Sequence, residues 1–348
     1  MSAPATKPRV ILGLMTFGPD VNNGARITSL DVFNKALDKF QARGYNEVDT
    51  ARAYIGGKQE AFTREANWKS RGLKLATKVH PMLGETQKPE VVTALFEKSL
   101  KELGTDCVDI AYLHAPDRRG PFAPVLAAMD ALHRAGKFVQ LGLSNFTSFE
   151  VAEVCLLCAA NNWVRPTIYQ GVYNIITRGI EPELVPACRR YGLDVVIYAP
   201  IMGGLVTGAY RPDEVPAEGR FSNKFFGGAV RMRTFQDANF EAVRMIREAV
   251  DKAGLTPVET ALRWVVHHSK LNIKDGGNDG VLVGVGKMEH LDSNLDDLEK
   301  GPLPAEVVEA LEAAWNVART ANVVYWHGGD EIKYAYDTVE AVFGKDRK

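Results

Sequence analysis

The fold is decided by three consecutive segments, LKLATK (73–78), PEVVTALFEKSLKEL (89–103) and CVDIAYL (107–113). The first and third are short apolar runs of the kind that form buried strands. The second has the apolar spacing of an amphipathic helix and begins with a proline. Parallel strands need a long crossover between them, which is usually a helix. These residues therefore predict a strand–helix–strand unit with two parallel strands.

The same alternation of apolar runs and amphipathic stretches covers most of the chain. We expect strands at 10–15, 45–49, 73–78, 107–113, 138–143, 167–170, 193–198 and 280–284. The helices expected to follow them span 29–42, 59–70, 89–103, 122–135, 148–161, 181–191, 256–269 and 288–298. Eight such units favour an α/β fold of the (β/α)8 TIM barrel type. An open dinucleotide-binding sheet is disfavoured because no G-x-G-x-x-G links a strand to a helix.

Two additions extend this minimal barrel. We expect one domain over 1–348, with the barrel at about 9–300, an insertion at 200–255 and a C-terminal extension at 301–348. The insertion contains a Gly-rich loop and an extra helix predicted over 235–253. Long loops in a compact domain are usually functional, so both additions are expected over the mouth at the C-terminal ends of the strands. The alternative is that they cap the barrel or form the contact of a homodimer.

The charge balance of the chain favours a small-molecule partner. Its 42 basic and 43 acidic side chains give a formal net charge of -1, which leaves no excess to attract nucleic acid or an anionic membrane surface. The N-terminus, MSAPATKPRV, lacks the apolar core of a secretion signal, and no apolar run approaches the roughly 20 residues that cross a bilayer. We therefore expect a cytoplasmic protein without a membrane or nucleic-acid partner.

The cysteines and the paired histidines do not indicate a metal or redox centre. Four cysteines are too few for a disulfide framework in a chain of this length, and we expect reduced thiols at Cys107, Cys155, Cys158 and Cys188. Cys155 and Cys158 form a C-x-x-C within VAEVCLLCAA, whose helical apolar spacing favours a buried position over metal binding. His267 and His268 are adjacent and lack metal-ligand spacing. No metal is expected.

Six predicted strands each end on, or are followed within two residues by, a polar residue of a different chemical kind. Because the C-terminal ends of barrel strands share one mouth, these residues are expected to be neighbours. They are Asp49, Lys78, His114, Asn145, Gln170 and Tyr198. Such a set suits the reduction of a carbonyl, which requires a hydride donor, an acid for the developing alkoxide and hydrogen-bond donors that polarise the oxygen.

Tyr54 is the candidate acid. A phenol with an ordinary pKa of about 10 needs a nearby cation to act at neutral pH, and Lys78 is placed to supply one. Asp49 then holds the ammonium and keeps it charged, while His114 hydrogen-bonds the carbonyl oxygen and fixes its direction. Taken singly, each residue also fits an ordinary packing or solvated position.

Three motifs carry a resemblance to a known family, EVDTARAY (47–54), LATKVHP (75–81) and AYLHAPD (111–117). They match, in order, the Asp, Tyr, Lys and His motifs of the aldo-keto reductase superfamily. The resemblance continues through LGLSNF (141–146), Gln170, YAPIMGGLVTG (198–208), EGRF (218–221) and VGVGKMEHLDSNL (283–295). The chain is most similar to the branch that contains the aflatoxin aldehyde reductases, and the β subunits of voltage-gated potassium channels are more distant relatives.

The resemblance implies a TIM barrel that binds NADP(H) without a Rossmann fold. It implies a catalytic tetrad made of Asp49, Tyr54, Lys78 and His114. By the same resemblance, the carboxamide of the nicotinamide is held by Ser144, Asn145 and Gln170. Tyr198 would stack on the nicotinamide ring, and Met15 would lie near the cofactor.

Two segments are suited to the phosphates of the cofactor. The loop 200–208 supplies small residues whose backbone amides can approach a pyrophosphate closely, and 286–290 opens the last helix, where amide groups and dipole favour anions. Lys287 suits the 2′-phosphate of NADP, with a solvated surface lysine as the alternative. His290 departs from the glutamine common in the family. The contacts expected here are Pro200, Gly203, Leu205, Gly208, Arg220, Gly284, Lys287, His290 and Asn294.

Three functions are compatible with these residues. The leading one is an NADPH-dependent reductase of a small-molecule aldehyde or ketone, with Tyr54 as the proton donor. The second is a cofactor-binding regulatory subunit with slow turnover, like the channel subunits, although the complete tetrad argues against it. The third is a barrel lyase that uses Lys78 as a Schiff-base nucleophile, which would require a desolvated lysine rather than one that faces Asp49.

The C-terminal region departs most from the relatives. Its aromatic and imidazole side chains form either a wall for a flat or hydrophobic substrate or a packing layer on the barrel or a second subunit. They are Trp315, Tyr325, Trp326, His327, Tyr334 and Tyr336. Arg231 and Arg233 are candidates for binding a substrate carboxylate, with a solvent-facing position as the alternative.

Overall fold

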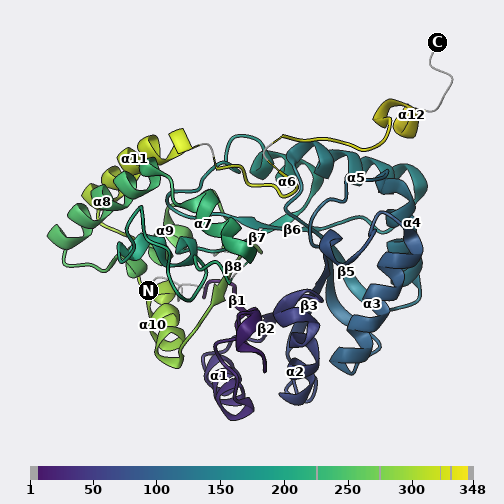
Figure 1. Ribbon diagram of the computed structural model, residues 1–348, viewed down its shortest axis with the longest axis horizontal. Coiled ribbons are helices and arrows are strands. Elements are labelled where there is room, and N and C mark those ends of the chain that lie inside the picture. The colour runs from purple at the N-terminus through teal and green to yellow at the C-terminus, as the bar shows by residue number, and fades with distance from the viewer. Residues whose placement is uncertain (1–6, 225, 274–275, 322, 330, 344–348) are drawn as a thin grey trace.

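A closed barrel of parallel strands forms the centre of the protein (Figure 1). The structure is a computed structural model that describes residues 7–224, 226–273, 276–321, 323–329 and 331–343. Within these ranges the strands are β1 (Val10–Gly13), β2 (Glu47–Asp49), β3 (Lys74–Val79), β4 (Val108–Leu113), β5 (Phe138–Ser144), β6 (Ile168–Val172), β7 (Asp194–Tyr198) and β8 (Gly280–Gly284). They pair in chain order, and β1 closes the barrel against β8. The predicted TIM barrel is confirmed.

Helices that follow the strands cover the outside of the barrel. They are α1 (Leu30–Ala42), α2 (Gln59–Glu65), α3 (Pro89–Leu103), α4 (Phe122–Arg134), α5 (Ser148–Asn161), α6 (Leu184–Tyr191), α9 (Pro257–His267) and α10 (Met288–Glu299). The helix predicted over 59–70 ends early, because Asn67 adopts a left-handed conformation with φ 57°. The helix predicted to begin at residue 181 begins at Leu184.

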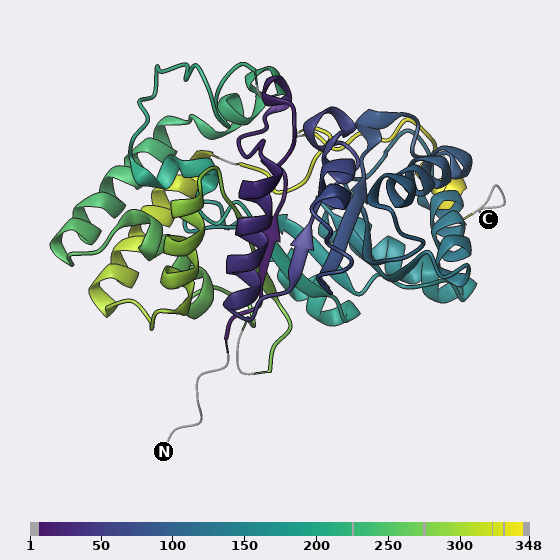
Figure 2. The ribbon, with the colours of Figure 1, turned by 90° about the horizontal axis from the view of Figure 1, so that it is seen from below.

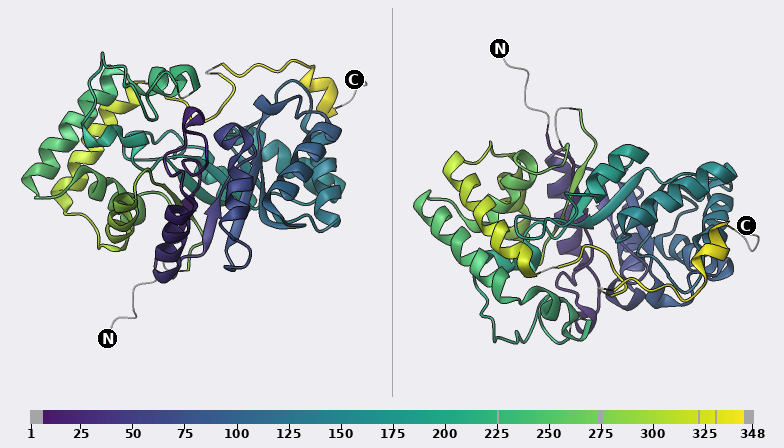
Figure 3. Two further views of the ribbon diagram at one scale, coloured as in Figure 1. Left: turned by 60° about the horizontal axis from the view of Figure 1, so that its bottom comes forward. Right: turned by 90° about the horizontal axis from the view of Figure 1, so that it is seen from above.

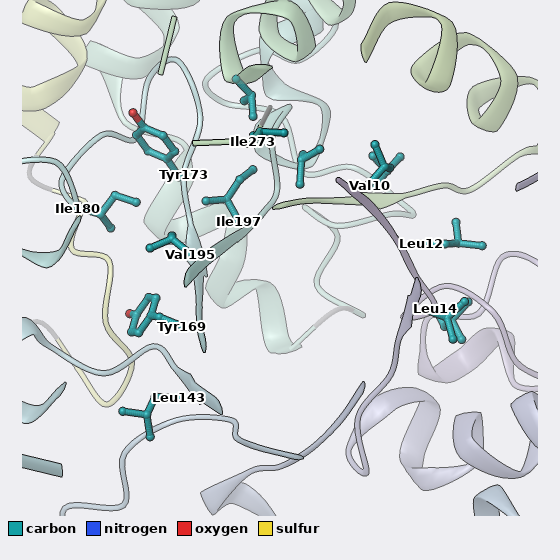
Figure 4. Packing of buried hydrophobic residues seen from close by; sticks show 14 of the residues in the cluster. Val10, Leu12, Leu14, Leu143, Tyr169, Tyr173, Ile180, Val195, Ile197 and Ile273 are labelled. Carbon is teal, nitrogen blue, oxygen red and sulfur yellow. The ribbon is translucent and has the colours of Figure 1, made fainter. Parts of the chain in front are cut away.

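The barrel has two apolar layers because both faces of its strands are buried. Consecutive side chains of a strand point to opposite faces. In β1, Val10 and Leu12 therefore pack towards the surrounding helices (Figure 4), whereas Ile11 belongs to a separate cluster inside the barrel. The inner cluster consists of Ile11, Ala76, Ile110, Tyr112, Ile168 and Val196.

Gly142 of β5 is required by this inner packing. A Cβ placed there would lie 2.3 Å from a ring carbon of Tyr112. We expect Gly142→Ala to lower the free energy of unfolding by about 1–3 kcal/mol, because the overpacked interior must shift. Urea unfolding measures this change. The matched control is Gly301→Ala, where a Cβ would meet nothing within 4 Å. Equal stability of both variants would contradict the packing argument.

The insertion and the C-terminal extension each contain a helical part and a part that reaches the mouth. The insertion includes α7 (Ala229–Thr234) and α8 (Asp237–Lys252), and the extension includes α11 (Ala305–Ala318) and α12 (Thr338–Phe343). The helices α8 and α11 pack against each other beside the barrel (Figures 1 and 2). The chain between α11 and α12 crosses the molecule (Figure 3), and the backbone N–H of His327 donates to the carbonyl oxygen of Asn145 at 3.1 Å.

The cysteine and histidine pairs behave as structural residues. Cys155 and Cys158 are buried in α5 as free thiols. His267 Nε2 contacts the carbonyl oxygen of Lys300 at 2.7 Å, and His268 Nε2 accepts from the backbone N–H of Leu303 at 2.9 Å. Among the described residues, no group of three or more His, Cys, Asp and Glu side chains is arranged to hold a metal. No helix in the same part of the chain is both long and apolar enough to cross a membrane.

Candidate active site

The structure brings Asp49, Tyr54, Lys78 and His114 together at the mouth of the barrel. Lys78 Nζ donates to Asp49 Oδ1 and lies 3.3 Å from the hydroxyl oxygen of Tyr54. The rings of Tyr54 and His114 are 5.8 Å apart in an edge-on arrangement. Residues from three separate segments of the sequence therefore form one cluster, and the strand ends predict this for Asp49, Lys78 and His114.

The pair of Lys78 and Asp49 is deeply buried. Lys78 is 0 % and Asp49 2 % exposed, and Lys78 also donates to the carbonyl oxygen of Thr50 at 2.9 Å. The side-chain amide of Gln170 donates to the second carboxylate oxygen of Asp49 at 2.9 Å. Gln170, which the sequence analysis expects on the nicotinamide carboxamide, therefore also holds Asp49 in place.

The surroundings fix the protonation states of this cluster. Burial raises the pKa of the Tyr54 phenol, and the nearby charge of Lys78 opposes this rise without cancelling it. Burial alone would lower the pKa of Lys78, but the Asp49 carboxylate raises it above its ordinary value. Burial and the charge of Lys78 hold the pKa of His114 well below its usual range. At neutral pH the phenol is protonated, the ammonium is charged and the imidazole is neutral.

The direction of the pKa shift of Tyr54 differs from the one expected from the sequence. The sequence analysis expects Lys78 to depress the pKa of Tyr54, whereas the net direction is upward. The physical reason is that burial of the phenol outweighs the attraction between the phenolate and one ammonium whose charge is shared with Asp49.

Tyr54 stands at the start of a strained turn. Ile55 has φ 52° and ψ 46°, and Gly56 and Gly57 also have positive φ. Such a left-handed conformation costs a residue with a side chain roughly 1–2 kcal/mol. Strain of this kind persists where surrounding contacts hold it, and it is common at functional sites. The side chain of Arg52 provides one such contact, because it donates to the carbonyl oxygen of Gly57.

The residues expected around the nicotinamide lie at the ends of β5 and β7. Asn145 donates to the carbonyl oxygen of His114 at 2.9 Å and to Ser144 Oγ at 3.0 Å, and it accepts from the hydroxyl of Tyr198 at 2.7 Å. Met15 follows β1, and its sulfur lies 2.8 Å from a guanidinium nitrogen of Arg220. Asn145 therefore links Ser144 and Tyr198 to His114 of the Lys78 cluster.

The residues expected around the phosphates lie on three segments. The loop after β7 forms a 3-10 turn, Met202–Thr207, in which Gly203 has φ 66° and Gly204 has φ 99°; Gly208 closes it with φ 70°. Leu205 is 1 % exposed and packs in the core. Pro200 precedes this turn and is buried.

The start of α10 provides the other part of that region. Gly284 ends β8, and Lys287 is the exposed residue that immediately precedes α10. Asn294 is 6 % exposed within the helix. His290 is exposed in the first turn of α10. These positions leave Lys287 and His290 accessible to an anion at the mouth.

Arg26 is a further candidate site residue, which the sequence did not indicate. A Cβ on Gly219 or Gly286 would lie 2.8 or 2.9 Å from its guanidinium nitrogens. Burial lowers the pKa of Arg220, and the charge of Arg26 lowers it further, so the two cations are close to each other. Arg26 has no ion pair with any described residue. In the sequence, only Gly219 and Gly286 hint at this position of Arg26, and their closeness to its guanidinium appears only in the folded structure.

The C-terminal segment places His327 near the tetrad. The carbonyl oxygen of His327 accepts from Arg118 at 2.6 Å, and its ring lies 6.2 Å from that of His80. The ring of His80 lies 4.9 Å from that of His114. Burial lowers the pKa of His80 to about 4 and that of His327 to about 3. A row of neutral imidazoles therefore borders the mouth, and the sequence analysis missed His80.

Most of the other C-terminal aromatic residues pack on the barrel. Tyr325 donates to Glu183 at 2.7 Å, and Tyr334 donates to Glu150 at 2.9 Å. Trp315 stacks on the guanidinium of Arg178, and Tyr336 packs edge-on against Tyr334.

Trp326 and the two candidate arginines lie nearer the mouth. Arg233 approaches the carbonyl oxygen of Trp326 at 3.5 Å, and its charge contributes to the low pKa of His327. Arg231 instead donates to the carbonyl oxygen of Phe221 at 2.8 Å. One guanidinium nitrogen of Arg231 therefore already has a hydrogen-bond acceptor within the insertion.

Comparisons with known proteins agree with this fold. A sequence model described as Aldo/keto reductase family matches residues 9–316. Aflatoxin B1 aldehyde reductase member 2 of Rattus norvegicus is 39 % identical over 333 residues, which cover 91 % of this chain and 87 % of the relative. The Homo sapiens protein of the same name is 39 % identical over 330 residues, covering 91 % and 89 %. Aldo-keto reductase pigE of Monascus ruber is 37 % identical over 340 residues, covering 93 % and 99 %. The chain belongs to the aldo/keto reductase family, a family of oxidoreductases that act on carbonyl groups.

Proposed function

We propose that the protein is an NADPH-dependent reductase of aldehydes or ketones in which Tyr54 gives the proton. The observation that carries this proposal is the chain of contacts from Asp49 through Lys78 to the Tyr54 hydroxyl, with Lys78 Nζ 3.3 Å from the phenol oxygen. Relatives whose names say that they are aldehyde reductases support an aldehyde as the substrate.

The residues at the mouth fit this cofactor. The guanidinium of Arg26 lies across Gly219 and Gly286, where a Cβ would leave no room for it. Together with Arg220 and the exposed Lys287, it gives a basic region suited to the phosphates. Ser144, Asn145 and Tyr198 would hold the nicotinamide end. When bound, NADPH supplies the hydride that the carbonyl carbon accepts.

The residues of the chain then orient and protonate the carbonyl oxygen of the substrate. Tyr54, kept protonated by its raised pKa, donates its hydroxyl proton to the oxygen as negative charge develops there. Lys78 stabilises the phenolate that remains, and Asp49 keeps Lys78 charged and in place. The neutral ring of His114 donates a hydrogen bond that orients the oxygen. The product is an alcohol.

A direct assay separates this function from its alternatives. NADPH and an aromatic aldehyde are mixed with the protein, and the absorbance of the reduced nicotinamide is followed. Turnover supports the reductase, whereas tight NADPH binding without turnover across a broad panel of aldehydes supports a regulatory subunit. Borohydride trapping of substrate on Lys78 supports a lyase, but the raised pKa of this lysine is the opposite of what a Schiff-base nucleophile needs.

We expect Lys287 to discriminate between NADPH and NADH. In Lys287→Gln, the Kd for NADPH rises about 10-fold while the Kd for NADH stays the same, because only NADPH carries the 2′-phosphate. Quenching of tryptophan fluorescence measures both constants without any need for turnover. The matched control is Lys252→Gln at the exposed end of α8. An equal rise of the Kd for NADPH and for NADH would show that Lys287 does not recognise the 2′-phosphate.

A further inference from the structure

A buried polar network lies behind the turn that carries Tyr54. Arg52 forms an ion pair with Glu60, and its other terminal nitrogen donates to the carbonyl oxygen of Gly57. Glu60 also accepts a hydrogen bond from the hydroxyl of Thr77 at 2.6 Å. Arg52 is 5 %, Glu60 0 % and Thr77 0 % exposed. The mechanism proposed above uses none of these three side chains.

This network joins the two segments whose separation sets the contact between Tyr54 and Lys78. Arg52 precedes Tyr54 by two residues, its guanidinium holds Gly57 beyond it, and its backbone N–H donates to the carbonyl oxygen of Lys78 at 2.9 Å. Thr77 immediately precedes Lys78 on β3. Because consecutive strand residues face opposite sides, Thr77 reaches Glu60 of α2 while Lys78 reaches the mouth. The Glu60 carboxylate therefore restrains both segments from behind.

The turn needs this restraint because its backbone is strained. Ile55, a β-branched residue, holds φ 52° directly after Tyr54. On one side the turn rests on the first loop of the barrel, where a Cβ on Gly18 would lie 3.0 Å from the Ile55 side chain. On the other side Arg52 contacts Gly57, and a Cβ on Gly57 would lie 2.9 Å from its guanidinium. Loss of Arg52 would allow the turn to relax.

We propose that the Arg52–Glu60 pair is a positioning unit that keeps the Tyr54 hydroxyl at the Lys78 ammonium. The inference rests on the proposed function and adds to it two residues that touch neither substrate nor cofactor. A buried ion pair usually gives no more stability than well-packed apolar side chains of similar volume. A role in geometry therefore accounts for a charged pair at this position better than a role in stability does.

The test removes both charges at once. In the double variant Arg52→Met with Glu60→Leu, no unpaired charge remains in the interior. We expect kcat for aldehyde reduction to fall by about 10- to 100-fold, since misplacement of a reacting group by about 1 Å can cost that much. We expect the KM for the aldehyde and the Kd for NADPH to change by less than about 3-fold, because ground-state binding is untouched.

The control is a second Arg–Glu pair of the same chemistry. Arg263 and Glu259 form an ion pair at 2.8 Å on α9, away from the turn. The double variant Arg263→Met with Glu259→Leu is expected to keep the wild-type kcat. Circular dichroism and urea unfolding report whether each double variant is folded.

A milder pair of variants decides the question if the first double variant does not fold. Thr77→Val removes the hydrogen bond to Glu60 and is expected to lower kcat several-fold, whereas Thr77→Ser keeps the hydroxyl and is expected to retain the wild-type kcat. Wild-type kcat in the folded Arg52–Glu60 double variant, or equal kcat in Thr77→Val and Thr77→Ser, would overturn this inference while leaving the proposed function intact. A wild-type protein that reduces no carbonyl would overturn both.

Discussion

Tyr54→Phe is expected to lower kcat for carbonyl reduction by about 100- to 10,000-fold, the range that a positioned general acid contributes. The ring and its packing next to His114 remain, and only the hydroxyl that reaches Lys78 is lost. The Kd for NADPH, measured by fluorescence quenching, should therefore be close to that of the wild type. A folded Tyr54→Phe protein with wild-type kcat would show that the phenol is not the proton donor.

The pH dependence of the wild-type enzyme follows from the same group. Reduction requires the protonated phenol, and burial raises the pKa of Tyr54 above its ordinary value. We therefore expect kcat for reduction to be level through neutral pH and to fall only as the pH rises through this raised pKa. The reverse reaction, which requires the phenolate, should rise over the same interval. A fall of the reduction rate at mildly acidic pH would contradict this assignment.

Lys78→Met is expected to damage both activity and stability. Its removal leaves Asp49, which is 2 % exposed, without its cation, and breaking a buried ion pair on one side costs about 3–5 kcal/mol. The free energy of unfolding from urea titrations should fall by that amount at neutral pH. Turnover should fall by at least about 100-fold, because the phenolate of Tyr54 loses the charge that stabilises it.

The double variant Lys78→Met with Asp49→Asn separates these two effects. Removal of both charges is expected to restore much of the stability without restoring turnover. In Lys78→Met alone, burial raises the pKa of Asp49 in the folded state above its unfolded value, so protonation favours folding. The unfolding free energy of that variant should therefore be highest at low pH and should decrease as the pH rises through the raised pKa. Activity in the double variant would contradict the role of Lys78.

The barrel was predictable because each parallel strand is a nearly continuous buried apolar run. The strand over 280–284 matches the prediction, and the extra helix predicted over 235–253 is α8 at 237–252. The helices of the C-terminal extension, α11 and α12, were not predicted. The helix over 59–70 stopped early at a left-handed asparagine, a local choice that apolar periodicity does not report.

The tetrad was predictable for a different reason. Strand ends of a barrel converge whatever the loops do, so Asp49, Lys78 and His114 had to meet once the fold was set. Arg26 and His80 were missed, and the two alternatives for His327 stayed open, because the places of these residues depend on how loops fold over the mouth. The pKa direction of Tyr54 was also wrong, because burial is a property of the folded chain and no motif encodes it.

Transfer of a labelled hydride shows whether the protein reduces a carbonyl with NADPH. The wild-type protein is given NADPH that carries deuterium at the transferred position of the nicotinamide, together with an aromatic aldehyde, and the product is examined by NMR. We expect an alcohol with deuterium on the former carbonyl carbon, formed by the wild type and at least about 100-fold more slowly by Tyr54→Phe. An alcohol without the label, or NADPH binding with no product from any aldehyde, would contradict this expectation.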